Sequence, residues 1–167
     1  MNFKVSSSAL YSRLTLASKV LASKNVLPIL DCFLFDIKDG NITVTASDGD
    51  KYFITQVPVI EHDCDARFCI SAKTIMDSIK ELAEQPLALG FNPDNMAIIG
   101  RHSSGTFNLS GMDASVYPLP ISPEEGCTTL TLPAKVLLDG ISRCLFATAN
   151  DQVRAAMNGI YMDIKPD

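Results

Sequence analysis

The chain has 167 residues and a mass of 18.1 kDa, with 47% apolar and 20% charged residues, so it can bury a core without disulfide or metal staples. This composition excludes wholesale disorder, and no apolar run approaches the roughly 18 residues that a membrane-spanning helix needs. The net charge of −5 argues against a uniformly basic nucleic-acid-binding surface, but it permits one basic face on an acidic body.

The first predicted elements are a short strand and a helix within Phe3–Leu14. Apolar residues alternate at the start of this segment and then recur four residues apart, which is the change from strand to helix periodicity. Residues 28–37, 41–47 and 51–60 follow and are typical of three strands, with a hairpin signal at Asp39-Gly40-Asn41.

The same order of elements then recurs along the chain. A strand and helix in Phe68–Ile79 precede three strands at 86–91, 95–101 and 105–111, and a third strand and helix begin at Leu130. The segments FKVSSSALYSRL, FCISAKTIMDSI and LTLPAKVLLDGI match position by position, which indicates an internal repeat. Ser6, Ser71 and Pro133 are expected to open the three helices.

Each predicted helix carries an apolar stripe. The stripes are Leu10, Leu14, Ala17 and Leu21 in the first, Ile75, Ile79 and Leu82 in the second, and Leu137, Ile141, Cys144 and Thr148 in the third. Only one predicted strand, at 159–165, follows the third helix.

The repeats predict a division into domains. Two complete units form one domain over residues 1–121, residues 122–126 are typical of a linker, and residues 127–167 begin a second domain. Because the third unit has one strand after its helix instead of three, we expect a fragment of a longer protein rather than a naturally short unit. The N-terminus does not resemble a secretory signal, and with five scattered cysteines this favours the cytosol.

No group of residues predicts a catalytic or metal site. Residues 100–106 have the glycine spacing of a phosphate-binding loop but lack its lysine and its helix, so a hairpin turn is expected there. Asp48-Gly49-Asp50 lacks a calcium-ligand series and is interpreted as a turn. His62, Cys64 and Cys69 lack a fourth nearby ligand, so we expect reduced thiols, no metal and no cofactor.

The predicted helices carry a more positive net charge than the rest of the chain. The first helical window carries Arg13, Lys19 and Lys24 and no acid, and each helix has a lysine opposite its apolar stripe: Lys19, Lys80 or Lys135. One interpretation is ordinary solvated helix faces. The other is a weakly basic helical layer on an acidic body.

The chain resembles the N-terminal part of the bacterial DNA polymerase III beta subunit family, the sliding clamps. The resemblance rests on the order and spacing of MNFKVSSSALYSRL, LPIL, FDIKDGNITVTASD, ISAKTIMDSIKEL, YPLP, LTLPAKVLLDGI and VRAAMNGIYMDI. It implies the α+β DNA-clamp fold, with helices on one face of antiparallel sheets and two repeat units per domain.

The resemblance also implies a non-catalytic function. In this family two chains close head to tail into a homodimeric ring around duplex DNA, and the ring tethers DNA polymerase III, the clamp loader and other partner proteins. Such a ring stays on DNA because it encloses the duplex, and not because it binds tightly. A weakly basic inner wall is therefore enough, and it contacts backbone phosphates without reading the base sequence.

Individual residues take expected roles from the resemblance. The positions expected at DNA are Lys24, Lys73, Lys80, Asp151, Gln152 and Arg154. Ala155 and Ala156 stand where some members have aromatic residues, which puts base stacking there in doubt. Thr74, Ser78, Phe107 and Leu109 are expected at the ring interface, with Phe107 and Leu109 forming an exposed apolar edge. Met157 is expected in one wall of the peptide-binding cleft.

Two other classes of protein remain as alternatives. A self-associating repeat scaffold with no nucleic-acid role would show no preference for closed circular over linear DNA. An enzyme would use the turn at residues 100–106 to hold phosphate, so changing Gly105 would abolish its activity.

Overall fold

A computed structural model describes residues 1–22, 25, 27–120, 130–149 and 154–165. The chain divides into two compact units, Met1–Ile121 and Ser122–Asp167, and each is described by itself. The predicted linker at 122–126 lies outside the described residues.

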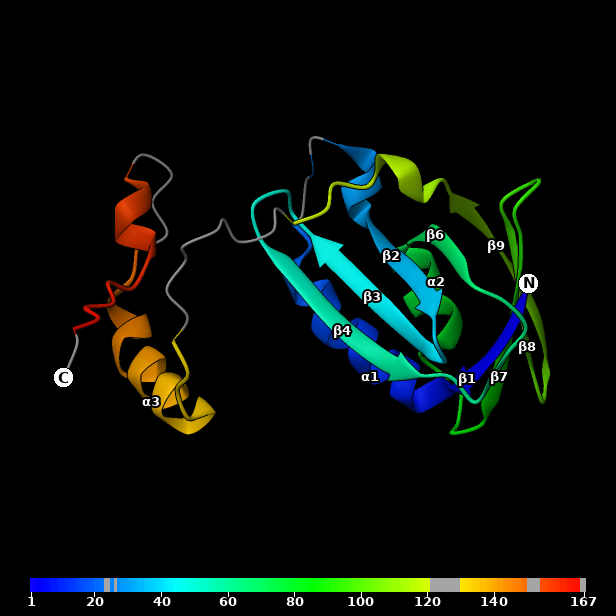
Figure 1. Ribbon diagram of the computed structural model, residues 1–167, viewed down its shortest axis with the longest axis horizontal. Coiled ribbons are helices and arrows are strands. Elements are labelled where there is room, and N and C mark those ends of the chain that lie inside the picture. Colours follow the sequence, from blue (N-terminus) through cyan, green and yellow to red (C-terminus); the bar gives the residue numbers. More distant parts are fainter. Residues whose placement is uncertain (23–24, 26, 121–129, 150–153, 166–167) are drawn as a thin grey trace. The chain divides into compact units, whose positions relative to one another are not determined.

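The first unit contains the strand–helix–three-strand order twice (Figure 1). The first repeat comprises β1 (Asn2–Ser6), α1 (Ser7–Ala17), β2 (Cys32–Lys38), β3 (Asn41–Ser47) and β4 (Tyr52–Pro58). The second comprises β6 (Ala66–Ser71), α2 (Ala72–Ile79), β7 (Pro86–Asn92), β8 (Ala97–His102) and β9 (Gly105–Met112), and the short β5 (Glu61–His62) lies between the repeats. The predicted α+β fold class is confirmed.

One predicted strand begins later than expected. Residues 28–31 form a 3₁₀ turn, Pro28–Asp31, rather than the start of β2. Pro28 opens this turn, and the Leu30 N–H donates to the Leu27 carbonyl at 3.0 Å. Proline has no N–H for a sheet ladder, and its fixed φ suits the first position of a helical turn, which explains the difference.

The strands are all antiparallel and run in the order β4-β3-β2-β6-β9-β8-β7-β1-β5. The first strand of each repeat pairs with the first strand after the helix of the other repeat: β1 with β7, and β6 with β2. The register is equivalent at both junctions, since Val5 faces Leu87 and Ile70 faces Phe33. Each repeat therefore completes the sheet of the other.

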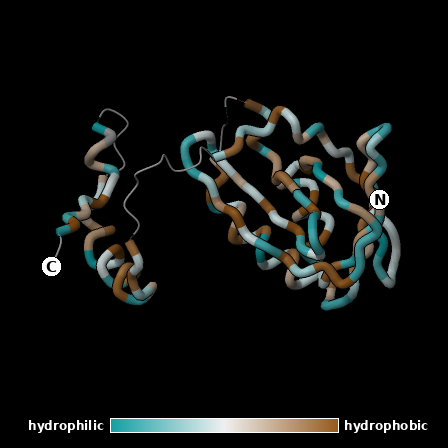
Figure 2. Tube along the Cα trace, in the orientation of Figure 1, coloured by the Kyte–Doolittle hydropathy of each residue, from teal (hydrophilic) through white to brown (hydrophobic). Residues whose placement is uncertain are grey.

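The core fills the space between the helices and the strands. Phe3, Leu10 and Leu14 are buried from the first repeat, and Phe68 and Ile75 from the second. The Phe68 ring stacks between Phe35 and Phe91, with centroids 5.7 and 4.3 Å away. Both helices pack against this core and against each other, and their polar residues are mostly exposed. Figure 2 colours the chain by hydropathy and shows short hydrophobic and hydrophilic stretches following one another along the first unit.

The second unit contains one longer helix, α3 (Ala134–Cys144), and 3₁₀ turns at Leu145–Ala147 and Ala155–Asn158. The strands predicted at 130–132 and 159–165 are wrong for this structure, because no strand is present in residues 130–149 and 154–165. A strand exists only through a hydrogen-bonded partner, and an alternating pattern does not supply one. In the described ranges, no helix has the length and apolar character needed to cross a membrane.

Candidate nucleic-acid interface

The solvent face of α2 carries charge at helical spacing. Lys73, Asp77 and Lys80 are four and three residues apart, which places them on one face, and all three are exposed. The opposite face buries Ala72, Ile75 and Ile79. Lys80 Nζ lies 3.8 Å from Asp77 Oδ1, whereas Lys73 forms no ion pair with any described residue.

The neighbouring helix adds cations without acids. Arg13 is exposed on α1, and Lys19 is exposed in the 3₁₀ turn Ser18–Val20 that follows it. Residues 7–20 contain no Asp or Glu, and α1 packs beside α2. The polar faces of α1 and α2, with Arg13, Lys19, Lys73 and Lys80, are called the helix layer below.

The acidic residue Glu84, which follows α2, is hydrogen-bonded at the start of α1. The Glu84 carboxylate receives a hydrogen bond from Ser6 Oγ at 2.8 Å and from the Ser8 N–H at 3.2 Å, at the N-terminus of α1. Hydrogen bonds from Ser8 and Ser6 hold the pKa of this carboxyl below its ordinary value. Glu84 therefore stays ionised while it accepts the free N–H group of Ser8 in the first turn of the helix.

The helix layer is suited to weak contact with a polyanion. Lysines on flexible stems act as point charges that meet phosphates in many geometries, and they do not read base edges. Sequence reasoning assigned Lys73 and Lys80 to this surface, and both are exposed, Lys73 on α2 and Lys80 directly after it. Sequence reasoning did not assign Arg13 or Lys19 to the site. The absence of Asp and Glu from the helical segment that contains them could have indicated both.

The remaining predicted site residues belong to the second unit or to undescribed positions. Lys24, Asp151 and Gln152 lie outside the described residues. Arg154 is exposed just before the turn Ala155–Asn158, and Met157 is exposed within that turn.

The predicted interface strand is less exposed than expected. β9 pairs with β8 from Gly105 to Ser110 but with β6 only at Gly111 and Met112, so most of one backbone edge is open. Leu109 was predicted to be exposed, and this is wrong: it is 6% exposed. Because side chains alternate along a strand, Leu109 and Phe107 share the face directed toward the core. Phe107 is partly buried there.

The other two predicted interface residues lie on α2. Thr74 is exposed and its hydroxyl donates to Ser71 Oγ at 3.1 Å, while Ser78 Oγ donates to the Thr74 carbonyl at 2.8 Å. Both hydroxyls therefore already donate hydrogen bonds, one to the residue before α2 and one within the helix.

The glycine- and aspartate-containing motifs are turns, as predicted. Residues 103–104 connect β8 to β9 as a hairpin. Asp48 Oδ1 accepts hydrogen bonds from the N–H groups of Asp50 and Lys51, at 3.1 and 2.8 Å, and Gly49 has φ +102°. Of these, the bond from the Lys51 N–H contributes most to lowering the pKa of the Asp48 carboxyl.

The described cysteines are free thiols, as predicted. Cys32 and Cys69 are buried, and burial raises their pKa values to about 11 and about 12, so neither is a ready nucleophile. Cys64 and Cys144 are exposed. Among the described residues, no three His, Cys, Asp or Glu side chains are placed to hold a metal ion.

Comparison with known proteins gives a consistent result. The family model for the DNA polymerase III beta subunit, N-terminal domain, matches residues 1–122. The beta sliding clamp of Halalkalibacterium halodurans is 27% identical over 173 aligned positions, which cover 99% of this chain and 45% of that protein.

Solved structures show the same fold. The DNA polymerase III beta subunit of Thermotoga maritima has a TM-score of 0.76 at 30% identity, over 91% of this chain and 41% of that one. The beta subunit of Pseudomonas aeruginosa has a TM-score of 0.85 at 21% identity, over 95% of this chain and 43% of that one. The chain thus spans less than half the length of these relatives.

Proposed function

Because the chain belongs to the DNA polymerase III beta subunit family, we propose that it is part of a sliding clamp, a non-catalytic ring that encircles duplex DNA and tethers a DNA polymerase during replication. The observation that carries the proposal is the helix layer, where Arg13, Lys19, Lys73 and Lys80 are exposed on or directly after the two adjacent helices and Asp77 is paired with Lys80. The proposal places the protein in the bacterial cytoplasm, where replication takes place.

The charge of the helix layer matches what a sliding ring requires. A strongly basic wall would hold phosphates and slow translocation, whereas a few flexible cations tolerate the duplex without trapping it. Under this proposal Lys24, Lys73, Lys80, Asp151, Gln152 and Arg154 face DNA.

The protein contacts follow from the same proposal. The open edge of β9, with Phe107, and the nearby Thr74 and Ser78 meet another domain of the ring, and Leu109 supports that edge from the core side. Met157 contributes to the cleft that receives peptides from the polymerase, the clamp loader and other partners.

A salt titration with two charge-reversed variants tests the DNA contact. Arg13→Glu/Lys73→Glu reverses two cations of the helix layer, and Lys38→Glu/Arg101→Glu reverses two exposed cations near the ends of strands β2 and β8. None of the four forms an ion pair with another residue that the structure describes. Both variants change the net charge by the same amount.

For the unaltered chain, fluorescence anisotropy should show weak binding to duplex DNA, with a dissociation constant of about 10⁻⁴ M or weaker at physiological salt. The helix-layer variant should bind more weakly and with a flatter salt dependence, and the strand variant should change less. Equal losses in both variants, or micromolar sequence-selective binding, would contradict the assignment.

Topology distinguishes the clamp from a repeat scaffold. A complete ring should remain on nicked circular DNA during gel filtration and leave when the DNA is linearised. Equal retention on both forms would favour the scaffold.

A further inference from the structure

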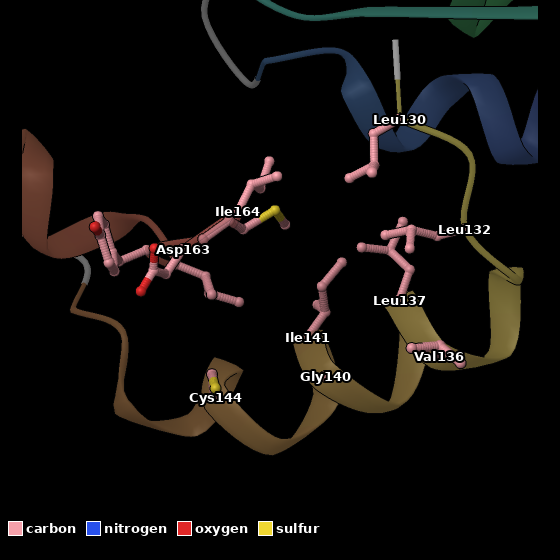
Figure 3. A pocket seen from close by; sticks show the side chains of 12 residues that line it. Leu130, Leu132, Val136, Leu137, Gly140, Ile141, Cys144, Asp163 and Ile164 are labelled. Carbon is pink, nitrogen blue, oxygen red and sulfur yellow. The ribbon is translucent and has the colours of Figure 1, made fainter. Parts of the chain in front are cut away.

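An apolar groove lies beside α3 in the second unit, where Leu130, Leu137, Ile141 and Ile164 point toward one shared space (Figure 3). The chain spans less than half the length of its relatives, and the described residues do not identify what covers this groove. The first unit differs because it contains two repeats. A surface of one repeat can therefore be compared with the equivalent surface of the other.

The two repeats of the first unit align through the strands that begin them. Residues 3–5 (FKV) in β1 match residues 68–70 (FCI) in β6, so Lys4 corresponds to Cys69. The residues on either side of each belong to the main core, so Lys4 and Cys69 point to the opposite face of the sheet. Because the apolar stripes of α1 and α2 belong to the same core, this outer face is turned away from both helices.

Strand pairing defines one row of outward-pointing residues in each repeat, since residues paired across antiparallel strands share a face. The first row, called the Arg101 row below, crosses β1, β7 and β8 with Lys4, Ala88 and Arg101. The second row, called the Thr45 row, crosses β6, β2 and β3 with Cys69, Leu34 and Thr45. The two rows are equivalent position by position.

The Thr45 row is covered by one aromatic side chain. Tyr117 packs with Cys69 and Leu34, and its hydroxyl donates to the Thr45 carbonyl at 3.4 Å. Tyr117 and all three residues of the row are buried. Tyr117 has an extended backbone and follows the turn Ala114–Val116, after β9. An aromatic side chain on an extended segment is therefore what fills this position of the fold.

The Arg101 row borders a cavity of about 330 Å³ instead of a buried ring. Lys4 and Arg101 are exposed and Ala88 is half-buried, and the small Ala88 leaves room where the other row has a leucine. The segment after β4 is the counterpart of the segment that carries Tyr117, but it stays at the edge of β1. There the Ile60 N–H donates to the Lys4 carbonyl at 2.7 Å.

One charge at this cavity has no partner. Lys4 pairs with Glu61, and the Asp63 carboxylate accepts a hydrogen bond from Asn2 Nδ2 at 2.9 Å. Arg101 forms no ion pair with another residue that the structure describes. Arg101 also lines an adjoining cavity of about 220 Å³, and the described residues around that one include no Asp or Glu. A guanidinium pairs with carboxylates and stacks on aromatic rings, so the group that complements this site carries both.

We propose that the Arg101 row binds an acidic peptide segment of a partner protein, which places an aromatic side chain over Ala88 and a carboxylate against Arg101. The aromatic side chain follows from Tyr117, which fills the equivalent row. The carboxylate follows from the unpaired charge of Arg101. The Arg101 row shares no residue with the helix layer and lies on the face turned away from it, so the peptide and DNA can bind at the same time.

Binding of a fluorescent peptide to the 167-residue chain tests the proposal. The probe Asp-Asp-Tyr-Asp-Asp should bind with a dissociation constant of roughly 10⁻⁴ M, measured by fluorescence anisotropy. Asp-Asp-Ala-Asp-Asp lacks the ring and Asn-Asn-Tyr-Asn-Asn lacks the carboxylates, and each should bind about tenfold more weakly or worse. No binding of the probe up to millimolar concentrations, or equal binding of all three peptides, would overturn the proposal.

Two variants with matched controls locate the site. Arg101→Gln should raise the dissociation constant about tenfold or more, whereas Lys38→Gln removes the same charge from an exposed residue outside both cavities and should change it little. Ala88→Leu introduces the side chain found in the Thr45 row and should block binding, whereas Ala83→Leu, at an exposed position outside the cavity, should not. Circular dichroism verifies folding. Equal effects within either pair would overturn the assignment.

Two further measurements distinguish a partner protein from other occupants. A complete ring should bind the probe as tightly as the 167-residue chain does, and loss of binding in the ring would show that the rest of the protein covers the Arg101 row. Sedimentation velocity should show no self-association that depends on Ala88. An association of the chain that Ala88→Leu abolishes would make a second copy the occupant and overturn the proposal.

Discussion

Phe107 shows how one side chain constrains a residue on the next strand. Phe107 lies directly opposite Gly100 across the β8–β9 hairpin. A Cβ atom at Gly100 would lie 2.1 Å from Phe107 Cζ, far inside van der Waals contact. The glycine therefore leaves room for an aromatic ring, and it does so without an unusual backbone conformation.

We expect Gly100→Ala to destabilise the first unit by about 1–3 kcal/mol, because the ring must leave its position or the strands must separate. Urea unfolding measures the change. Adding Phe107→Leu should recover part of the loss, and Gly105→Ala on the same hairpin should cost little, since its nearest neighbour would be 3.9 Å away. A small effect of Gly100→Ala would show that the hairpin adapts freely.

Asp48 couples the stability of a turn to pH. Its pKa is below the ordinary value of 3.8, so its contribution to stability is fully present above that value and is lost as the pH falls toward and through the folded-state pKa. Asp48→Asn keeps an oxygen acceptor and removes the charge. The variant should be less stable at pH 7, and the difference should shrink at pH 3; a difference that is the same at both values would exclude the charge as its cause.

The two helices of the first unit begin in different ways although their sequences align. Ser6 Oγ accepts the Ala9 N–H at 3.1 Å and caps α1. Ser71 occupies the equivalent position before α2 but forms no side-chain capping bond, and its hydroxyl accepts from Thr74 Oγ1 instead. Matching sequence positions thus perform different local functions.

We expect Ser6→Ala to lower the free energy of unfolding by about 1 kcal/mol, because α1 loses its cap and Glu84 loses a hydrogen-bond donor. Ser71→Ala should cost less than about 0.5 kcal/mol, which makes it the matched control. Denaturant unfolding of both variants gives the comparison. Equal losses would indicate that the cap at Ser6 contributes nothing specific.

Periodicity predicted the helices of the first unit well because each one buries a single face, and the four-residue spacing in α1 reflects the buried Leu10 and Leu14. β2 buries both faces, with Phe33 and Phe35 in the main core and Leu34 in a second cluster, so its continuous apolar run rather than alternation indicated the strand. The same signal failed at 130–132 and 159–165, where the apolar pattern is present but no described strand completes the ladder. The two-residue strand β5 is too short to carry a period at all.

The candidate site was predictable only in part. The position of Lys80 opposite an apolar stripe predicted its exposure, because charged residues on that side of a helix face solvent, and the resemblance supplied Lys73, which is also exposed. The burial of Leu109 was missed because the resemblance assigned Phe107 and Leu109 to an exposed interface edge, whereas both lie on the face of β9 directed toward the core. The need for glycine at position 100 depends on a cross-strand contact that only the register reveals.

At the scale of the whole molecule, the two units differ in how well their helices are covered. α1 and α2 bury their apolar stripes, whereas no residue of α3 is buried. An 11-residue helix without tertiary cover is marginal in water.

Hydrogen exchange should therefore be faster in α3 than in α1 and α2 at low protein concentration. Amides of β2 and β6, inside the sheet, should exchange slowest because they open only with global unfolding of the first unit. Mass spectrometry of peptic fragments resolves these segments. Protection of α3 equal to that of α1 in a dilute sample would contradict the structure of the second unit.

The pairing of β1 with β7 also sets an order of events during synthesis. The amino group of Met1 donates to the Phe91 carbonyl, 90 positions along the chain, so the first strand emerges from the ribosome long before its partner exists. At translation rates of roughly 5–20 residues per second, β1 waits about 5–20 s for β7. During that interval Phe3 and Val5 have no sheet to join, and a nascent chain arrested before residue 86 should be a better substrate for chaperones and proteases than one arrested after the first unit has emerged.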